Sequence, residues 1–133
     1  MGFDQYHEPP EELPAETRTF ARLCASLTEE AEAIGWYEQR LALEKDPEAH
    51  AVMSDAVGEE YKHFAMDLEF LLRKKPKWRQ IAAGVLFRDG DIVEHGEAAE
   101  AAAGDDGGGG SGGGGGGAYD GSLGIGSLKG ATR

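Results

Sequence analysis

The sequence has only one cysteine, Cys24, among its 133 residues. A single thiol can form neither a disulfide within the chain nor a thiolate metal cluster, so a reducing compartment, the cytoplasm, is expected. Apolar runs are short, and none approaches the roughly 20 residues that a membrane-spanning helix needs. The first 14 residues are acidic and lack an apolar stretch, so we do not expect them to act as a signal peptide.

Basic residues are also scarce. The chain has 13 Lys and Arg against 25 Asp and Glu, which gives a net charge of −12. Nucleic acid is therefore not an expected partner, because a phosphate backbone attracts Lys and Arg. Glycine is rare early in the chain, where five of the 21 glycines precede residue 91. The core must come from about the first 90 residues, and so small a core buries little surface unless the chain associates.

Prolines and glycines divide the chain into four predicted segments. Three prolines among acidic residues favour an extended arm over residues 1–14. Residues 15–92 carry a periodic apolar pattern and are predicted to form a helical domain. Residues 107–117 are ten glycines and one serine, which predicts a disordered tether over residues 93–120.

Apolar side chains return only in the last segment, residues 121–133. Leu123, Ile125 and Leu128 are spaced along a glycine-rich stretch. A few apolar side chains in such a setting are typical of a linear motif that binds a partner. A glycine run of this kind is also typical of an engineered linker, and the sequence does not distinguish the two origins.

The helical domain is predicted to contain two long amphipathic helices. The first spans residues 16 to about 45 and the second about 48 to 74, with Asp46-Pro47 as the break between them. Their apolar residues recur every three or four positions, at Phe20, Leu23, Leu27, Ile34, Tyr37 and Leu41 and then at Met53, Val57, Phe64, Leu68 and Leu71. A short third segment covers residues 77–87. The predicted fold class is all-α, an antiparallel two-helix hairpin plus a short third helix.

Two carboxylates and an imidazole interrupt the apolar stripes. At about 100° per residue, Glu30 projects onto the centre of the first stripe and Glu60 onto the second, with His63 at the edge of the second stripe. An unpaired buried carboxylate is costly, so a cation or a shared proton is expected there. Glu60 and His63 also have the Glu-x-x-His spacing of ferritin-like dinuclear sites. A partly buried polar cluster without metal is the alternative.

The number of these residues indicates half of such a site. A ferritin-like site uses a lone Glu twice and Glu-x-x-His twice, and this chain supplies each once. Two copies packed about a two-fold axis would complete the site, form a ferritin-like four-helix bundle and cover the apolar stripes. Carboxylates with one imidazole per metal suit iron or manganese better than copper or structural zinc.

The chain resembles the encapsulated ferritins, cargo proteins of the encapsulin nanocompartments, over residues 7–92. The motifs that carry the resemblance, in chain order, are His7-Glu8-Pro9, Glu16-Thr17, Glu29-Glu30, Trp36-Tyr37, Asp46-Pro47-Glu48, Glu59-Glu60 with His63, Leu68-Glu69-Phe70 and Leu86-Phe87. The terminal segment is similar to the encapsulation peptide of this family. The resemblance implies that residues 121–130 bind the inner wall of an encapsulin shell.

The resemblance also implies roles for individual residues. The ferroxidase ligands of the family correspond to Glu30, Glu60 and His63, and its tyrosine beside the metals to Tyr37. Its accessory acids near the metal entrance are similar to Glu29 and Glu32, which project off the core stripe. The implied assembly is a homodimer that forms a larger ring, with a decamer expected.

The function predicted from these observations is oxidation of Fe(II) to Fe(III) at a dinuclear iron site between two chains, for iron storage and detoxification in the lumen of an encapsulin shell. One alternative is a helical cargo or scaffold protein whose metals only clamp the dimer. The other is a ferritin-like carboxylate protein that uses manganese or another metal. Oxygen consumption on addition of Fe(II) and metal analysis of native material, respectively, distinguish these alternatives.

Overall fold

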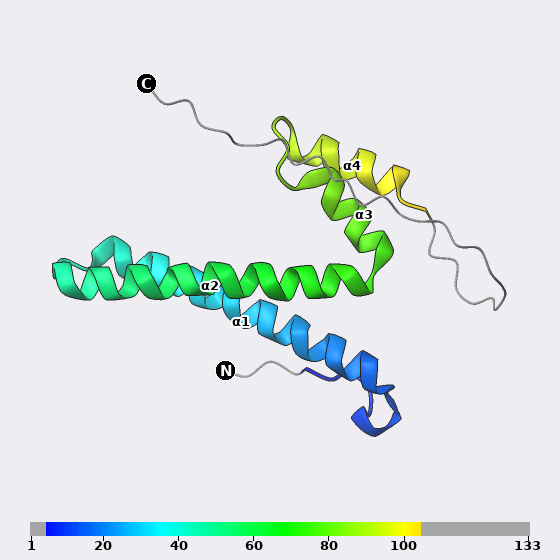
Figure 1. Cartoon of the computed structure of the whole chain (residues 1–133), viewed down its shortest axis with the longest axis horizontal. Helices are drawn as coiled ribbons and strands as arrows, with labels where there is room; N and C mark the ends of the chain where they lie inside the picture. Colours follow the sequence, from blue (N-terminus) through cyan, green and yellow to red (C-terminus); the bar gives the residue numbers. More distant parts are fainter. Residues whose placement is uncertain (1–4, 105–133) are drawn as a thin grey trace.

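Four α-helices and one 3-10 helix make up the computed structural model, which describes residues 5–104 (Figure 1). The elements are η1 (Pro10–Glu12), α1 (Ala15–Leu43), α2 (Pro47–Lys74), α3 (Pro76–Val85) and α4 (Ile92–Ala102). The all-α prediction is confirmed, and the described residues contain no strand. Within the predicted arm, η1 adds a short helical turn. No helix in the described part of the chain is long and apolar enough to cross a membrane.

The long helices α1 and α2 form an antiparallel hairpin, as predicted (Figure 1). The first ends at the break before Pro47, where the Glu44 N–H still donates to the carbonyl of Arg40 at 2.9 Å. Asp46 then caps α2, because its carboxylate accepts a hydrogen bond of 2.8 Å from the Ala49 N–H. Pro47 occupies the first turn, where its missing N–H costs nothing. The hairpin bends at this point because of these two residues.

The core of the single chain is small. Among the described residues, the buried apolar side chains are those of Val57, Leu71 and Leu72. Nine large apolar residues between residues 5 and 104 are exposed, namely Trp36, Leu43, Val52, Tyr61, Met66, Leu86, Phe87, Ile92 and Val93. Each long helix has only one neighbouring helix along its length. The hairpin alone therefore cannot cover the whole apolar stripe of both helices. The free chain therefore leaves apolar surface that association would bury.

Helix α3 is attached to the open end of the hairpin. The rings of Phe20 on α1 and Trp78 on α3 meet edge to face at a centroid distance of 6.4 Å. The guanidinium of Arg79 on α3 also lies 3.0 Å from the carboxylate of Glu69 on α2. These two contacts link α3 to both long helices.

Helix α4 was not predicted, and the predicted disordered tether is wrong for residues 93–102. The helix begins at Asp91, whose carboxylate accepts a hydrogen bond of 2.9 Å from the Glu94 N–H. The alanines and glutamates that follow are strong helix formers. The ring Nε2 of His95 lies 2.8 Å from the carbonyl oxygen of Asp89 and so ties α4 to the preceding turn.

Small residues allow α4 to pack closely against α3. A Cβ added to Gly84 would lie 2.4 Å from the Cβ of Ala99, a distance that no two such atoms adopt. Glycine at this position is therefore a packing requirement of the α3–α4 pair. The rest of the predicted tether from residue 105, and the whole predicted binding segment 121–133, lie outside the described residues.

Candidate metal centre

The three predicted ligands come together at the middle of the hairpin. Glu30 lies halfway along α1, and Glu60 and His63 lie one turn apart on α2. Because the two helices run antiparallel, these positions face each other. One potential ligand atom from each residue lies within 4.8 Å of the others. Within the part of the chain that the structure describes, this is the group of acids and histidines that could hold a metal ion.

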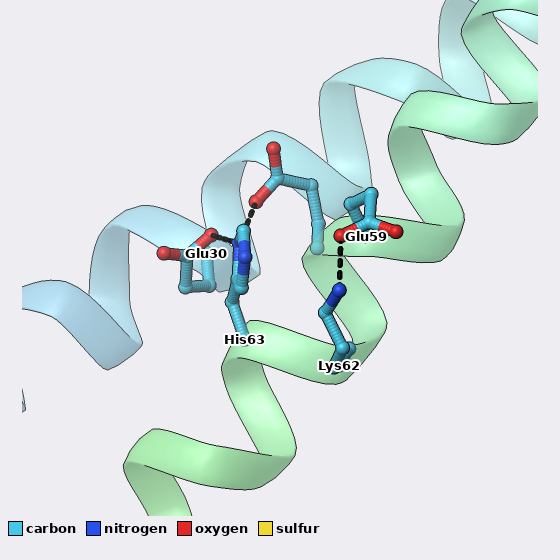
Figure 2. Close-up of polar contacts among 5 residues, drawn as sticks. Glu30, Glu59, Lys62 and His63 are labelled. Atoms are coloured by element: carbon cyan, nitrogen blue, oxygen red, sulfur yellow. Dashed lines mark hydrogen bonds and ion pairs between the residues drawn. The ribbon is translucent and has the colours of Figure 1, made fainter.

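The imidazole of His63 lies between the two carboxylates. Its Nδ1 atom is 3.5 Å from Oε2 of Glu60 and 4.0 Å from Oε2 of Glu30. Figure 2 shows the side chains of Glu30 and His63 turned toward each other across the two helices. The exposed fractions are 21% for Glu30, 23% for Glu60 and 46% for His63. The carboxylates are therefore half-buried, while the imidazole lies at an open edge.

The two carboxyl groups share a hydrogen bond, and it changes the pKa of each. The bond to Glu60, together with partial burial and the negative charge of Glu60, raises the pKa of Glu30 to about 7, against a smaller opposing effect of His63. The same hydrogen bond and the neighbouring imidazole lower the pKa of Glu60. Protonation of Glu30 thus extends up to near-neutral pH, where it relieves the repulsion between the two acids. A cation bound there would neutralise the same repulsion, so the donor set fits a divalent metal.

Two polar pairs beside the centre were missed by the sequence analysis. Lys62 forms an ion pair with Glu59, one helical turn away and next to the ligands (Figure 2). The hydroxyl of Tyr61 donates a hydrogen bond of 3.1 Å to Glu38 on α1. The spacing of three residues between Glu59 and Lys62 could have predicted the first pair. The second joins two helices, and no local pattern reveals it.

The remaining predicted site residues lie outside the group of three. Tyr37 follows Glu30 by seven residues, about 10 Å along the helix axis. Its half-buried ring lies 5.4 Å from the guanidinium carbon of Arg40. Glu29 and Glu32 flank Glu30 on α1 and are exposed. The structure therefore brings together the predicted ligands but leaves the predicted tyrosine and accessory acids apart from them in a single chain.

A helical hairpin with a lone Glu facing a Glu-x-x-His pair is typical of the ferritin-like class of helical proteins. The chain belongs to the EncFtn-like family, the encapsulated ferritin-like proteins, whose family model matches residues 5–89. This match covers the arm, the hairpin and α3 and ends before α4.

Individual relatives agree with this membership. The chain is 44% identical over 124 residues to a protein of Rhodospirillum rubrum named encapsulated ferritin-like protein, with 93% of this chain and 87% of the relative covered. It is 43% identical over 91 residues to a ferritin-like protein of Thermotoga maritima, with 68% and 80% covered. A crystal structure of a protein from Nitrosomonas europaea superimposes with a TM-score of 0.65 at 39% identity, over 68% of this chain and 99% of that one.

Proposed function

We propose that this protein is a ferroxidase, which oxidises Fe(II) to Fe(III) at a dinuclear site formed by two chains. The observation that carries the proposal is the convergence of Glu30, Glu60 and His63, whose potential ligand atoms lie within 4.8 Å of one another. Carboxylate and imidazole donors bind iron in both oxidation states. Membership in the encapsulated ferritin-like family supports iron as the metal.

One chain supplies half of the ligands that a dinuclear site needs. It offers two carboxylates and one imidazole, whereas ferritin-like sites use four carboxylates and two imidazoles. His63 stands at the open edge of the cluster, where a second chain has access to it. Two copies related by a two-fold axis would place two such edges face to face. The same contact would cover the half-exposed stripes of α1 and α2.

Iron is the substrate in this proposal, and the side chains bind and release it. Two Fe(II) ions enter between the paired ligand sets, and the proton shared by Glu30 and Glu60 leaves as the carboxylates bind metal. Each Fe(II) gives up one electron. The two electrons, together with two protons from solvent, reduce dioxygen to hydrogen peroxide, or hydrogen peroxide to two molecules of water. Bridging carboxylates from Glu60 would hold the two ions about 3.5–4 Å apart.

The other predicted residues have supporting roles in the proposal. Glu29 and Glu32 are exposed acids on either side of Glu30, and their charge would attract Fe(II) to the entrance of the site. Tyr37 would be the tyrosine close to the metals. It would reach them either from the second chain or from the edge of the paired site.

Storage requires a partner, because a helical hairpin has no interior volume for a mineral. The name of the relative from Rhodospirillum rubrum describes that protein as encapsulated. We propose that residues 121–130 of this chain bind the inner wall of an encapsulin shell, so that the protein works in the shell lumen. The shell would then hold the Fe(III) that the helical domain releases.

Metal is expected to drive the assembly of the protein. Titration of Zn(II), which is redox-inert, into metal-free protein should shift its mass from monomers or small species to dimers and larger rings, because the metal neutralises acids that repel each other. Native mass spectrometry or analytical ultracentrifugation measures this shift. The Glu60→Ala variant is the control that should not respond. Identical mass distributions with and without metal would contradict a site shared between chains.

A further inference from the structure

A further acid, Asp67, lies on the face of α2 that carries the metal ligands. It follows Glu60 by seven residues and His63 by four. At about 100° per residue, Asp67 projects between these two ligands, roughly 20° from Glu60 and roughly 40° from His63. The rise of the helix places its backbone about 6 Å beyond that of His63, toward the end of α2. The ligand face of α2 therefore continues by one helical turn to a third ionisable residue.

The side chain of Asp67 is half-buried and lacks a neutralising partner. Among residues 5–104, none forms a hydrogen bond or an ion pair with its carboxylate. Glu69 is also half-buried on α2, but Arg73 and Arg79 contact its carboxylate at 2.9 and 3.0 Å. A partly buried charge without a counter-ion is unfavourable, and its field is not cancelled locally. The charge of Asp67 therefore acts on the groups around it.

Asp67 acts on the candidate metal centre through Glu30. The hydrogen bond to Glu60, partial burial and the charge of Glu60 account for most of the raised pKa of Glu30, and the charge of Asp67 adds to it. A charge that repels the Glu30 carboxylate attracts a cation held by that carboxylate. Asp67 is not one of the three residues whose potential ligand atoms lie within 4.8 Å of one another. It therefore acts on a metal through space.

A fixed negative charge distinguishes metal ions by their own charge. Coulomb's law makes its attraction to a trivalent ion about one and a half times its attraction to a divalent ion at the same place. Partial burial reduces the screening of this attraction by water and salt. Groups around a metal site that are not ligands tune the reduction potential of the metal in this way. A carboxylate beside the ligands thus stabilises Fe(III) more than Fe(II).

We propose that Asp67 makes the metal centre select trivalent over divalent ions and thereby favours the oxidation of bound Fe(II). This inference rests on the proposed function, since it requires a metal held by Glu30, Glu60 and His63. The electron balance of the reaction is unchanged. Each Fe(II) loses one electron to dioxygen or hydrogen peroxide, while Asp67 keeps its charge and exchanges neither electrons nor protons. Asp67 is thus a specificity-determining residue that acts through its charge.

Replacement of Asp67 by asparagine tests this role, because Asp67→Asn removes the charge and keeps the shape of the side chain. Affinities for the redox-inert ions Zn(II) and Tb(III) would be measured by competition with chelators at pH 7.5, where most of the Glu30 carboxyl is already ionised. If the affinity for Zn(II) falls on the order of tenfold, the affinity for Tb(III) should fall about thirtyfold. The melting temperature without metal should be unchanged or higher, because a like charge near Glu30 has been removed.

Two variants control for shape and for net charge. Asp67→Glu keeps the negative charge and should bind both ions within about twofold of the unmodified chain. Asp55→Asn removes an exposed acid from α2, about 140° from Glu60 in projection, and should also change both affinities by less than about twofold. Equal losses for the two ions in D67N, or no loss, would overturn the proposal. A failure of the unmodified chain to bind Zn(II) would instead contradict the proposed metal site, so the two failures are distinguishable.

The reduction potential of bound iron gives an independent measure of the same selectivity. Losses of about tenfold for Fe(II) and about thirtyfold for Fe(III) differ by a factor of about three. At about 59 mV per tenfold change, this factor raises the potential by about 30 mV in D67N. Redox titration of the iron-loaded protein, followed by the absorbance of Fe(III), measures the shift. A potential that is equal or lower in D67N would overturn the proposal.

Discussion

Replacement of Glu60 or His63 by alanine is expected to abolish rapid oxidation of Fe(II). Each substitution removes a ligand from both halves of the paired site, so two donors are lost at once. Mutation of residues that only support metal ligands costs about 10–100-fold, and loss of the ligands themselves should cost more. Glu60→Ala also leaves Glu30 without its hydrogen-bond partner. Stopped-flow absorbance of Fe(III) formation, together with oxygen uptake, measures the effect.

Two matched variants control for the loss of a charge or a ring. Glu32→Ala removes an exposed acid from α1, and we expect it to keep the dinuclear site and change only the rate of metal entry. His50→Ala removes an exposed imidazole from α2 and should have no effect on the rate. If Glu60→Ala oxidised iron at the unmodified rate, the assignment of the site would be wrong.

Deletion of residues 121–133 is expected to abolish packaging into a co-expressed encapsulin while oxidase activity stays unchanged. The apolar residues of this segment, Leu123, Ile125 and Leu128, are too few to form a core and suit shallow pockets on a partner. Residues 107–117 separate them from α4 and have almost no side chains with which to pack on the helical domain. The segment should therefore contribute to location only.

Packaging is measured by the amount of protein that co-purifies with intact shells. Each single contact of so short a segment should be weak, and retention should depend on many copies displayed by one assembly. Replacement of Leu123, Ile125 and Leu128 together by serine provides a control of unchanged length and should also prevent packaging. Recovery of the truncated protein with shells at the yield of the full chain would contradict this role.

The hairpin and its three candidate ligands could be predicted because local rules determine them. Apolar residues at intervals of three and four define the two helices, and Asp46-Pro47 supplies both a cap and a break. Short connections make neighbouring helices antiparallel, so a residue in the middle of α1 faces the middle of α2. Glu30, Glu60 and His63 then meet because each lies on or beside an apolar stripe.

The features that were not predicted depend on contacts between distant residues or on weak local signals. Helix α4 depends on a cap at Asp91 and on close packing of Gly84 against Ala99. The glycine-rich sequence that follows the helix favours a disordered segment, so neither the cap nor the packing contact was recognised. The hydrogen bond from Tyr61 to Glu38 joins residues 23 positions apart. The left-handed backbone of Phe87 could not be expected either, because the sequence places a bulky aromatic residue where glycine or asparagine is favoured.

Anomalous scattering would locate a dinuclear iron site shared by two chains. Crystals of the protein would be soaked in Fe(II), and data would be collected at energies on either side of the iron absorption edge. We expect two anomalous peaks, about 3.5–4 Å apart, on or about a two-fold axis between chains and within bonding distance of Glu30, Glu60 and His63 from both. A single iron held by one chain, or iron bound elsewhere with these side chains free, would contradict it.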